Sequence, residues 1–405
     1  MRAAEPLAIH GGTPVRTRPM PPRRLFGEAE LQQVRAVFEH AWAIGTDFGY
    51  QGPFEAAYTQ AVVQWQGGGF ADAVSSGTAA LWLAALALEL PAGSEVICSP
   101  VTDPGGITPL VALGLKPVLA DSAPGSWRLA PESVQERITP RTRALLVTHV
   151  GGIPCDLDAL LAVARARDLR VIEDCAQAHG ARWRGQQVGT FGDCATFSTM
   201  FSKHHATGGC GGLVYTRDAR LYERLRAWAD RGKPFHAPDF APKDPTTFMM
   251  AGLNFNQDEI SCAIGTSTLA RLPAILAARR ALVERLVVGL QAARAIYLPS
   301  LPPDAEPAYF FVTLGVHLER LTVDKPTFAQ AVAAEGIPLN PDYRYVASEW
   351  PWLRPHLAAT ASTPHATAWR EHSFNLLLHE GYTVAEIDDI VAALLKVERT
   401  WLRKE

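Results

Sequence analysis

Short apolar segments alternate with helical segments through the first half of the chain, and this alternation limits the folds open to it. Strand-like runs are expected at 95–98, 117–121, 143–147 and 169–172, and a helix expected at 156–167 leads directly into the last of them. Strands separated by helices of this length are typical of a layered α/β fold with a largely parallel sheet. In such sheets, ligands bind at the carboxyl ends of the strands.

The run at 169–172 ends in two acids, Glu173 and Asp174, so a buried strand would bring a carboxylate to that edge. Lys203 follows after a second strand-like run at 195–200, and a glycine-rich return comes next. Burial lowers the pKa of a lysine amine from about 10.4, and a neutral amine can form an imine with an aldehyde. Pyridoxal phosphate (PLP) is such an aldehyde, and its ring nitrogen needs an acid partner, a role that suits Asp174. The same spacing also fits an unrelated, solvated Asp and Lys.

The composition excludes several classes of protein. The chain has 405 residues, 48% hydrophobic and 20% charged, which is ordinary for a globular protein with a large core. Its net charge of −3 gives no support for nucleic acid or a membrane as partner. We expect no 18-residue apolar span and no signal peptide, and six scattered cysteines without ligand spacing predict no metal site. Buried free thiols favour a cytoplasmic location.

The chain divides into three expected parts. Residues 1–28, rich in Pro and Arg, form an N-terminal arm; residues 29–271 form a large PLP-binding domain; residues 272–405 form a small C-terminal domain. The large domain is expected to begin with a helix whose apolar stripe is Leu31, Val34, Phe38 and Trp42.

Four further elements are expected near the border between the two domains. Asn256, with Glu259 three residues on, predicts a helix start close to a capping box. A separate long helix is expected at 272–292, and a strand at 309–314. A Pro-rich polar loop at 231–247 is expected outside the core.

Several segments, in order, resemble the DegT/StrS-type sugar aminotransferases, which are fold-type I PLP enzymes. The segments are LAIHGGTPVRTRP near the start, SSGTAAL at 75–81, EDCAQAHGA at 173–181, the lysine with its GG-x-GG return, GLNFNQDEISCAIG at 252–265 and LLLHEGYTVAEIDDIVAAL near the end. The resemblance covers nearly the whole chain. It implies a large domain with a mostly parallel mixed sheet between helices and a smaller C-terminal α+β domain.

The resemblance also implies roles for individual residues. Lys203 would hold PLP as an imine and then act as the general base, and Asp174 would pair with the ring nitrogen. The remaining cofactor contacts would be Ala176 on one ring face, Gln177 at the 3-hydroxyl, Thr78, Ala79 and Ser198 at the phosphate, and Asn254 at the phosphate of a neighbouring subunit.

The family's reaction would follow from these contacts. An amino acid, glutamate or glutamine, donates nitrogen to PLP, and the aminated cofactor passes it to a ketone on a nucleotide-linked sugar or a cyclitol. The expected pathway is amino-sugar or antibiotic biosynthesis, with an amino donor and a keto acceptor as small-molecule partners. Because family active sites use residues from two chains, a homodimer is expected.

Some positions depart from the family's pattern. Asp103 stands where an aromatic residue usually stacks on the ring, so it either binds a substrate group or makes a local Asx turn. Asn256 replaces an arginine, and Met200 and Cys210 replace a commonly polar and a commonly acidic residue.

Two more side chains are candidate substrate contacts. His204, beside the lysine, is either a proton carrier or structural, and Arg184 either meets an anionic group or is solvated.

Two alternatives to transamination remain open from the sequence. A PLP enzyme of the same fold could catalyse deoxygenation, oxidation or another transformation in a pocket rebuilt around Asp103. A non-catalytic sensor or scaffold could also retain the fold, although the intact Lys203, Asp174 and Gln177 argue against it.

Overall fold

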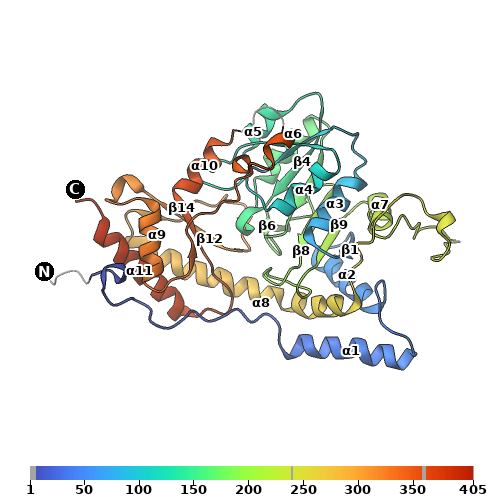
Figure 1. Ribbon diagram of the computed structural model, residues 1–405, viewed down its shortest axis with the longest axis horizontal. Coiled ribbons are helices and arrows are strands. Elements are labelled where there is room, and N and C mark those ends of the chain that lie inside the picture. Colours follow the sequence, from blue (N-terminus) through green and yellow to red (C-terminus); the bar gives the residue numbers. More distant parts are fainter. Residues whose placement is uncertain (1–5, 239, 358–361, 405) are drawn as a thin grey trace.

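The computed structural model describes residues 6–238, 240–357 and 362–404 (Figure 1). Residues 1–5 of the expected arm, residue 239 of the polar loop, and residues 358–361 and 405 of the expected small domain lie outside this description.

A seven-stranded sheet forms the centre of the larger body, in the order β1-β9-β8-β5-β4-β2-β3. Strand β9 runs antiparallel to both of its neighbours, and the other pairs are parallel, so the expected mixed, mostly parallel sheet is confirmed. The strands are β1 (Phe70–Val74), β2 (Glu95–Cys98), β3 (Lys116–Leu119), β4 (Thr142–Thr148), β5 (Arg170–Asp174), β8 (Cys194–Ser198) and β9 (Gly212–Thr216).

Helices cover both faces of this sheet because alternate residues of its buried strands point to opposite sides. On one face, Ile97, Leu145 and Val171 pack with α2, α6 and α8; on the other, Val96 and Leu146 pack with α3 and α7. The helices of this body are α1 (Glu28–Ile44), α2 (Pro53–Trp65), α3 (Gly77–Ala87), α4 (Thr108–Ala112), α5 (Pro131–Arg137), α6 (Leu157–Ala166), α7 (Ala219–Ala229) and the first part of α8 (Glu259–Gly289).

The C-terminal part builds a second hydrophobic cluster around an antiparallel sheet in the order β10-β12-β14-β13. Its elements are β10 (Ile296–Tyr297), β12 (Val312–Val316), α9 (Lys325–Ala334), β13 (Leu339–Asn340), α10 (Pro364–Glu371), β14 (Ser373–Leu376) and α11 (Val384–Trp401). A small sheet of β11 (Ala305–Glu306), β6 (Arg182–Trp183) and β7 (Gln186–Gln187) joins this part to the larger body.

Helix α8 connects the two clusters, and here the sequence-based expectation is wrong. One helix runs from Glu259 to Gly289 with Pro273 inside it, in place of two helices that meet near residue 271. The boundary expected at 271/272 therefore falls within a continuous helix. Its N-cap is Asp258, whose side chain accepts from the Ser261 amide, and not Asn256.

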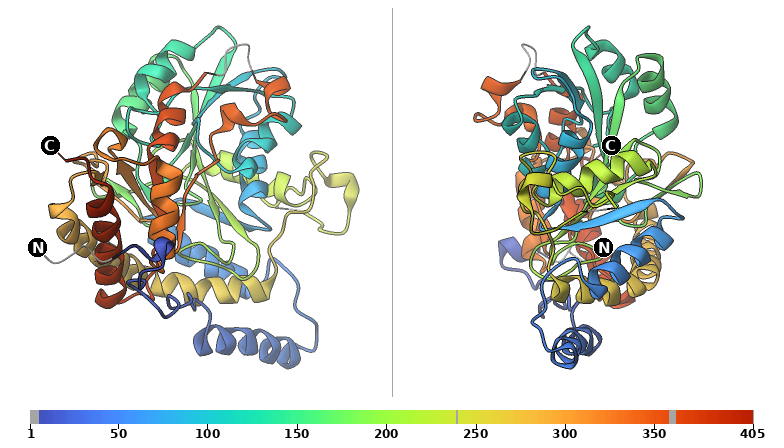
Figure 2. Two further views of the ribbon diagram at one scale, coloured as in Figure 1. Left: turned by 60° about the vertical axis from the view of Figure 1, so that its left-hand side comes forward. Right: turned by 90° about the vertical axis from the view of Figure 1, so that its right-hand side faces the viewer.

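Helix α1 starts where the sequence predicts, but its apolar stripe faces outward. Figure 2 shows α1 as an outermost helix lying along α8. Val37 and Ala41 are buried against α8, whereas Leu31, Phe38 and Trp42 are 51%, 37% and 74% exposed.

Two other expectations need correction. The strand expected at 309–314 begins only at Val312, because Tyr309 has a positive φ of 51° and the Phe310 amide donates to the Gly151 carbonyl. An 18-residue window within 259–292 has a mean hydropathy of 1.4, so α8 is long and apolar enough to cross a membrane, contrary to the expected absence of such a span. Because α8 packs against α1, α2 and α11, we assign it to the protein core.

Candidate active site

A cavity of about 210 Å³ opens at the carboxyl ends of β5 and β8, next to the first turn of α3. This is the edge at which ligands of parallel sheets bind. Its lining residues are Ser76, Gly77, Thr78, Leu81, Asp103, Gly105, Gly106, Asp174, Ala176, Ser198, Met200, Lys203, Cys210 and Gly211.

Lys203 lies on a turn after β8, where its amide donates to the Met200 carbonyl at 2.9 Å. The residue is 9% exposed, and its Nζ lies 4.6 Å from the centroid of the Phe310 ring. Burial lowers the pKa of this amine, and the nearby carboxylates of Asp174 and Asp103 oppose the shift. The side chain is therefore a buried amine that loses its proton more easily than a solvated lysine.

Asp174 is the last residue of β5 and lines the same cavity as Lys203. Burial raises the pKa of this carboxyl, although the Ala176 amide donates to its Oδ1 at 3.0 Å and Lys203 lies close. A cationic partner in the cavity would offset the cost of burying its charge.

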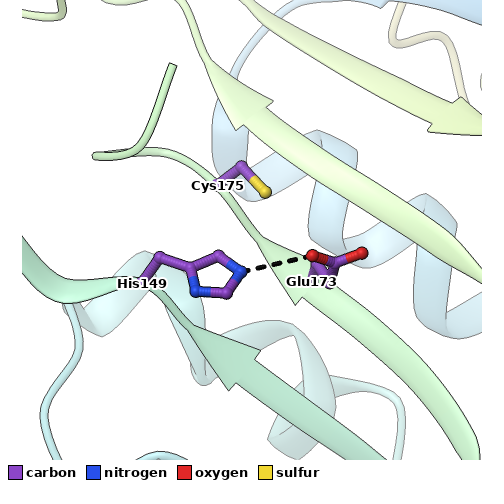
Figure 3. Close-up of side chains that lie close together, drawn as sticks. All are labelled: His149, Glu173 and Cys175. Atoms are coloured by element: carbon purple, nitrogen blue, oxygen red, sulfur yellow. Dashed lines mark hydrogen bonds and ion pairs between the residues drawn. The ribbon is translucent and has the colours of Figure 1, made fainter. Parts of the chain in front are cut away.

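The neighbouring residue, Glu173, points to the other side of β5 and meets His149 and Cys175 (Figure 3). Its carboxylate accepts from three backbone amides, those of Gly189, Phe191 and Gly192, each at 2.8 Å. The His149 ring nitrogen Nε2 lies 3.3 Å from it.

The ligand atoms of these three side chains lie within 4.8 Å of one another, a spacing that a metal ion would also need. However, the Cys155 amide donates to His149 Nδ1 at 3.2 Å, so the other ring nitrogen carries the proton that points at Glu173. Burial raises the pKa of the Cys175 thiol to about 12, which keeps it protonated. The group is therefore a hydrogen-bonded structural link that fixes the end of β5.

The first turn of α3 forms one wall of the cavity. Ser76 caps the helix by accepting from the Ala79 amide at 3.0 Å. A Cβ added to Gly77 would lie 2.7 Å from Ser198 Cβ, so glycine lets the helix approach the end of β8. Backbone amides at such a helix start favour an anion.

The loop from Thr102 to Gly106 covers another side of the cavity. Asp103 Oδ1 accepts from the Gly105 amide at 2.9 Å, which is the local Asx bond anticipated from the sequence. The loop carries no aromatic side chain over Asp174, because Pro104 and two glycines follow Asp103.

The cavity brings together six of the side chains predicted from the sequence: Thr78, Asp103, Asp174, Ala176, Ser198 and Lys203. The Ala79 amide lies beside it but already donates to Ser76. Gln177 is not a lining residue; its Oε1 accepts from the Gly151 amide at 2.7 Å. Asn254 lies on an exposed segment, where its Oδ1 accepts from Asn256.

Two candidate substrate contacts lie away from the cavity. Arg184 is on the surface, paired with Asp158 and Asp304. His204 is fully buried and its Nε2 lies 3.0 Å from the Ala308 carbonyl, so it packs behind the lysine turn. We correct both expectations, since neither side chain lines the cavity.

Two other contacts of the lysine turn leave no local signal in the sequence. Phe310, whose ring lies near the amine, comes from the C-terminal part of the chain. Arg23 comes from the N-terminal arm and donates to the Lys203 carbonyl at 2.8 Å and to Glu380 at 2.7 Å. Both contacts are long-range, so only the folded chain reveals them.

Comparisons with known proteins agree with this geometry. The model of the DegT/DnrJ/EryC1/StrS aminotransferase family matches residues 25–395. The chain is 32% identical to a putative L-glutamine:3-amino-2,3-dideoxy-scyllo-inosose aminotransferase of Streptoalloteichus tenebrarius, over 97% of this chain and 98% of the relative. It is 32% identical to a GDP-perosamine synthase of Caulobacter vibrioides, over 85% and 90% of the two chains.

A solved aminotransferase from Psychrobacter cryohalolentis superposes with a TM-score of 0.88 at 28% identity, covering 94% of this chain and 99% of that one. The fold-type I architecture expected from the sequence is therefore confirmed. The family match covers most of the chain and includes every wall of the cavity. The protein belongs to the DegT/DnrJ/EryC1/StrS aminotransferase family.

Proposed function

We propose that the protein is a PLP-dependent aminotransferase, with Lys203 as the residue that holds the aldehyde. The observation that carries the proposal is that Lys203 and Asp174 line one cavity beside the start of α3. The cavity offers a buried amine, a buried carboxylate and the amides of a helix start, which match the aldehyde, ring nitrogen and phosphate of PLP. When bound, PLP supplies the carbonyl that takes up an amino group and a ring that accepts electrons.

The chain's own residues would then have distinct tasks. Asp174 would accept a hydrogen bond from the ring nitrogen and keep it protonated, because a buried carboxylate gains most from a cationic partner. Lys203 would carry a proton to and from the substrate carbon, and its lowered pKa suits a general base. Ala176 would pack against one ring face, and Gln177 would turn its amide toward the 3-hydroxyl.

The phosphate would lie against the start of α3 and the end of β8. Thr78 and Ser198 line this side of the cavity, and the α3 dipole favours an anion there. For the Ala79 amide to take part, Ser76 would have to give up the bond that it now accepts.

A second subunit would complete the site. Leu31, Phe38, Trp42 and Ile44 are exposed on α1, and burying such a surface against another copy is favourable. We propose a homodimer in which Asn254 of each chain contacts the phosphate in the partner's cavity. Its exposed position leaves it available to a second chain.

The substrates are proposed from the relatives. Glutamine or glutamate would be the donor, and the acceptor would be a keto-cyclitol or a nucleotide-linked keto-sugar in amino-sugar or antibiotic biosynthesis in the cytoplasm. The scyllo-inosose aminotransferase and GDP-perosamine synthase named above represent these two acceptor classes.

One experiment tests the reaction and the lysine together. The protein is incubated with PLP, reduced with borohydride and digested, and mass spectrometry is expected to find the cofactor on Lys203. Before reduction, glutamine or glutamate should remove the near-visible absorbance and release a 2-oxo acid. Lys203→Ala is expected to lower the turnover by about 10²–10⁴-fold or more, whereas Lys243→Ala, on an exposed loop, serves as the control.

Other results of this experiment would favour the alternatives. Cofactor on Lys203 with no response to either donor would indicate a different PLP reaction in the pocket around Asp103. If no cofactor binds, the aminotransferase proposal fails, and a non-catalytic sensor becomes the better description.

A further inference from the structure

The charged side chains among the described residues that line the cavity are Asp103, Asp174 and Lys203. Under the proposed function, Asp174 and Lys203 are committed to the cofactor. Asp103 is exposed, whereas Asp174 and Lys203 are buried. Asp103 is therefore the charged lining residue that remains available to a substrate.

The Asp103 carboxylate is held in one orientation. Its Oδ1 accepts from the Gly105 amide at 2.9 Å, and among the described residues Oδ2 has no hydrogen-bond partner. The Thr102 amide before it donates to the Tyr345 carbonyl at 3.1 Å. A Cβ on Gly105 would lie 2.3 Å from Thr78 Oγ1, so the loop lies closely against the start of α3.

Tyr345 is linked to the loop that carries Asp103, because its carbonyl accepts from the Thr102 amide. The rings of Tyr343 and Tyr345 are 4.8 Å apart, and Tyr343 is buried. Burial raises the pKa of Tyr343, and the charges of Tyr345 and Asp103 add to the shift, whereas a hydrogen bond with Gln177 opposes it. A carboxylate on the wall of a cavity, with one oxygen free of hydrogen bonds, attracts a cation that can donate to it.

We propose that Asp103 makes the enzyme select acceptor ketones that already carry an ammonium group. This inference rests on the proposed aminotransferase function and narrows its acceptor to a singly aminated ring ketone. The free Oδ2 would accept a charge-assisted hydrogen bond from that ammonium, while Oδ1 remains bound to Gly105.

A neutral hydroxyl would gain less from the same position. Hydrogen bonds to charged groups are stronger than those between neutral groups. An ammonium would also offset the negative charge of Asp103, which lines the same cavity as the carboxylate of Asp174. The expected discrimination between an ammonium and a hydroxyl in this position is about 10- to 100-fold.

The experiment is a competition between two acceptors on the enzyme loaded with PLP. 3-Amino-2,3-dideoxy-scyllo-inosose and the same ring ketone with a hydroxyl in place of the amine are mixed in equal amounts with glutamine. Mass spectrometry of the two products gives the ratio of the kcat/KM values. Because both acceptors react with the same aminated enzyme, any effect on the donor step cancels from this ratio.

The wild-type enzyme is expected to favour the amine-bearing ketone by about 10- to 100-fold, and Asp103→Asn should remove most of that preference. Asparagine keeps the oxygen that accepts from Gly105 and removes the charge. Asp388→Asn, an exposed carboxylate paired with Arg285, is the matched control and should leave the ratio unchanged.

Two outcomes overturn the inference: a wild-type ratio near one or below it, or an equal ratio in wild type and Asp103→Asn. The first outcome needs only the wild-type enzyme, so the inference can be tested even if the Asp103→Asn variant does not fold. Loss of absorbance with glutamine but no product from either ketone would also overturn it. If glutamine has no effect at all, the proposed aminotransferase function has failed instead.

Discussion

Two adjacent acids at the end of β5 have opposite environments. Burial would raise the pKa of Glu173, but His149 and three backbone amides outweigh it, and the pKa lies below its ordinary value. Burial raises the pKa of Asp174, which has one amide donor and faces the cavity. The alternation of side chains along a strand thus separates a structural acid from an acid that is open to a ligand.

Glu173→Gln is expected to lower the free energy of unfolding by about 3–5 kcal/mol, because the new amide group would meet backbone N–H donors inside the protein. Urea denaturation measures the change. Asp193→Asn, a partly exposed acid that also accepts from a strand amide, is the control and should cost less. A Glu173→Gln variant as stable as the wild type would contradict the structural role of this link.

The sequence predicted the residues of the site better than their contacts. Asp174 and Lys203 could be found because a strand ending in acid and a lysine followed by a glycine-rich return leave local patterns. The surface ion pairs of Arg184 and the burial of His204 depend on Asp158, Asp304 and Ala308, which are distant in sequence. No local pattern reports such contacts.

At the scale of elements, the start of α8 shows how a distant contact decides between two local signals. Both Asn256 and Asp258 could cap a helix. A capping box from Asn256 needs Glu259, but that carboxylate accepts from the amides of Gly52, Phe54 and Glu55 at the start of α2. The helix therefore begins after Asp258.

Asp258→Ala is expected to lower the free energy of unfolding by about 1 kcal/mol, since the Ser261 amide loses its acceptor. Asn256→Ala should cost less if Asn256 is not the cap, and Asp258→Ser should restore most of the loss. Thermal denaturation of the three variants gives the comparison. Equal losses for Asp258→Ala and Asn256→Ala would contradict this assignment of the cap.

The stripe on α1 illustrates a second limit at this scale. Its periodicity predicted a helix correctly, but periodicity does not say what an apolar face packs against. Val37 and Ala41 make the contact with α8, and the larger residues remain outside.

For the whole molecule, the layered sheet could be read from strand and helix spacing, whereas the continuity of α8 could not. Near residue 271 the sequence changes character, but Pro273 lies within an unbroken helix. The packing of both hydrophobic clusters along α8 stabilises the helix across that proline.

At the scale of the whole molecule, three buried histidines near the lysine turn should make the free energy of unfolding depend on pH. Burial lowers the pKa of His179 to about 4 and holds those of His204 and His205 well below 6.5. Below pH 6.5 the unfolded chain therefore binds protons that the folded chain does not, and stability falls as the pH falls. Buried Glu55 and Asp72, with pKa values raised to about 8 and about 6, act in the opposite direction.

The variant His205→Gln removes one of these titrating groups, and so tests how much His205 contributes to the pH dependence of stability. In the wild type, His205 Nε2 lies 2.9 Å from the Tyr58 hydroxyl. The side-chain amide of glutamine can take the place of this ring nitrogen and keep the hydrogen bond. The free energy of unfolding should fall less steeply between pH 6.5 and 4.5 than in the wild type, by up to about 1.4 kcal/mol per pH unit. Denaturation at several pH values measures the slopes, and parallel curves would show that His205 is already charged in the folded protein.

The hydrogen bonds of Arg23 have a consequence for how the protein folds during synthesis. The carbonyl oxygens of Lys203 and His204 are bound by an arginine near the beginning of the chain, and Glu380, near its end, holds that arginine. During synthesis on a ribosome, the turn that presents the amine therefore stays incomplete until the final segment has emerged. PLP would then be bound only after the segment that carries Glu380 has been made.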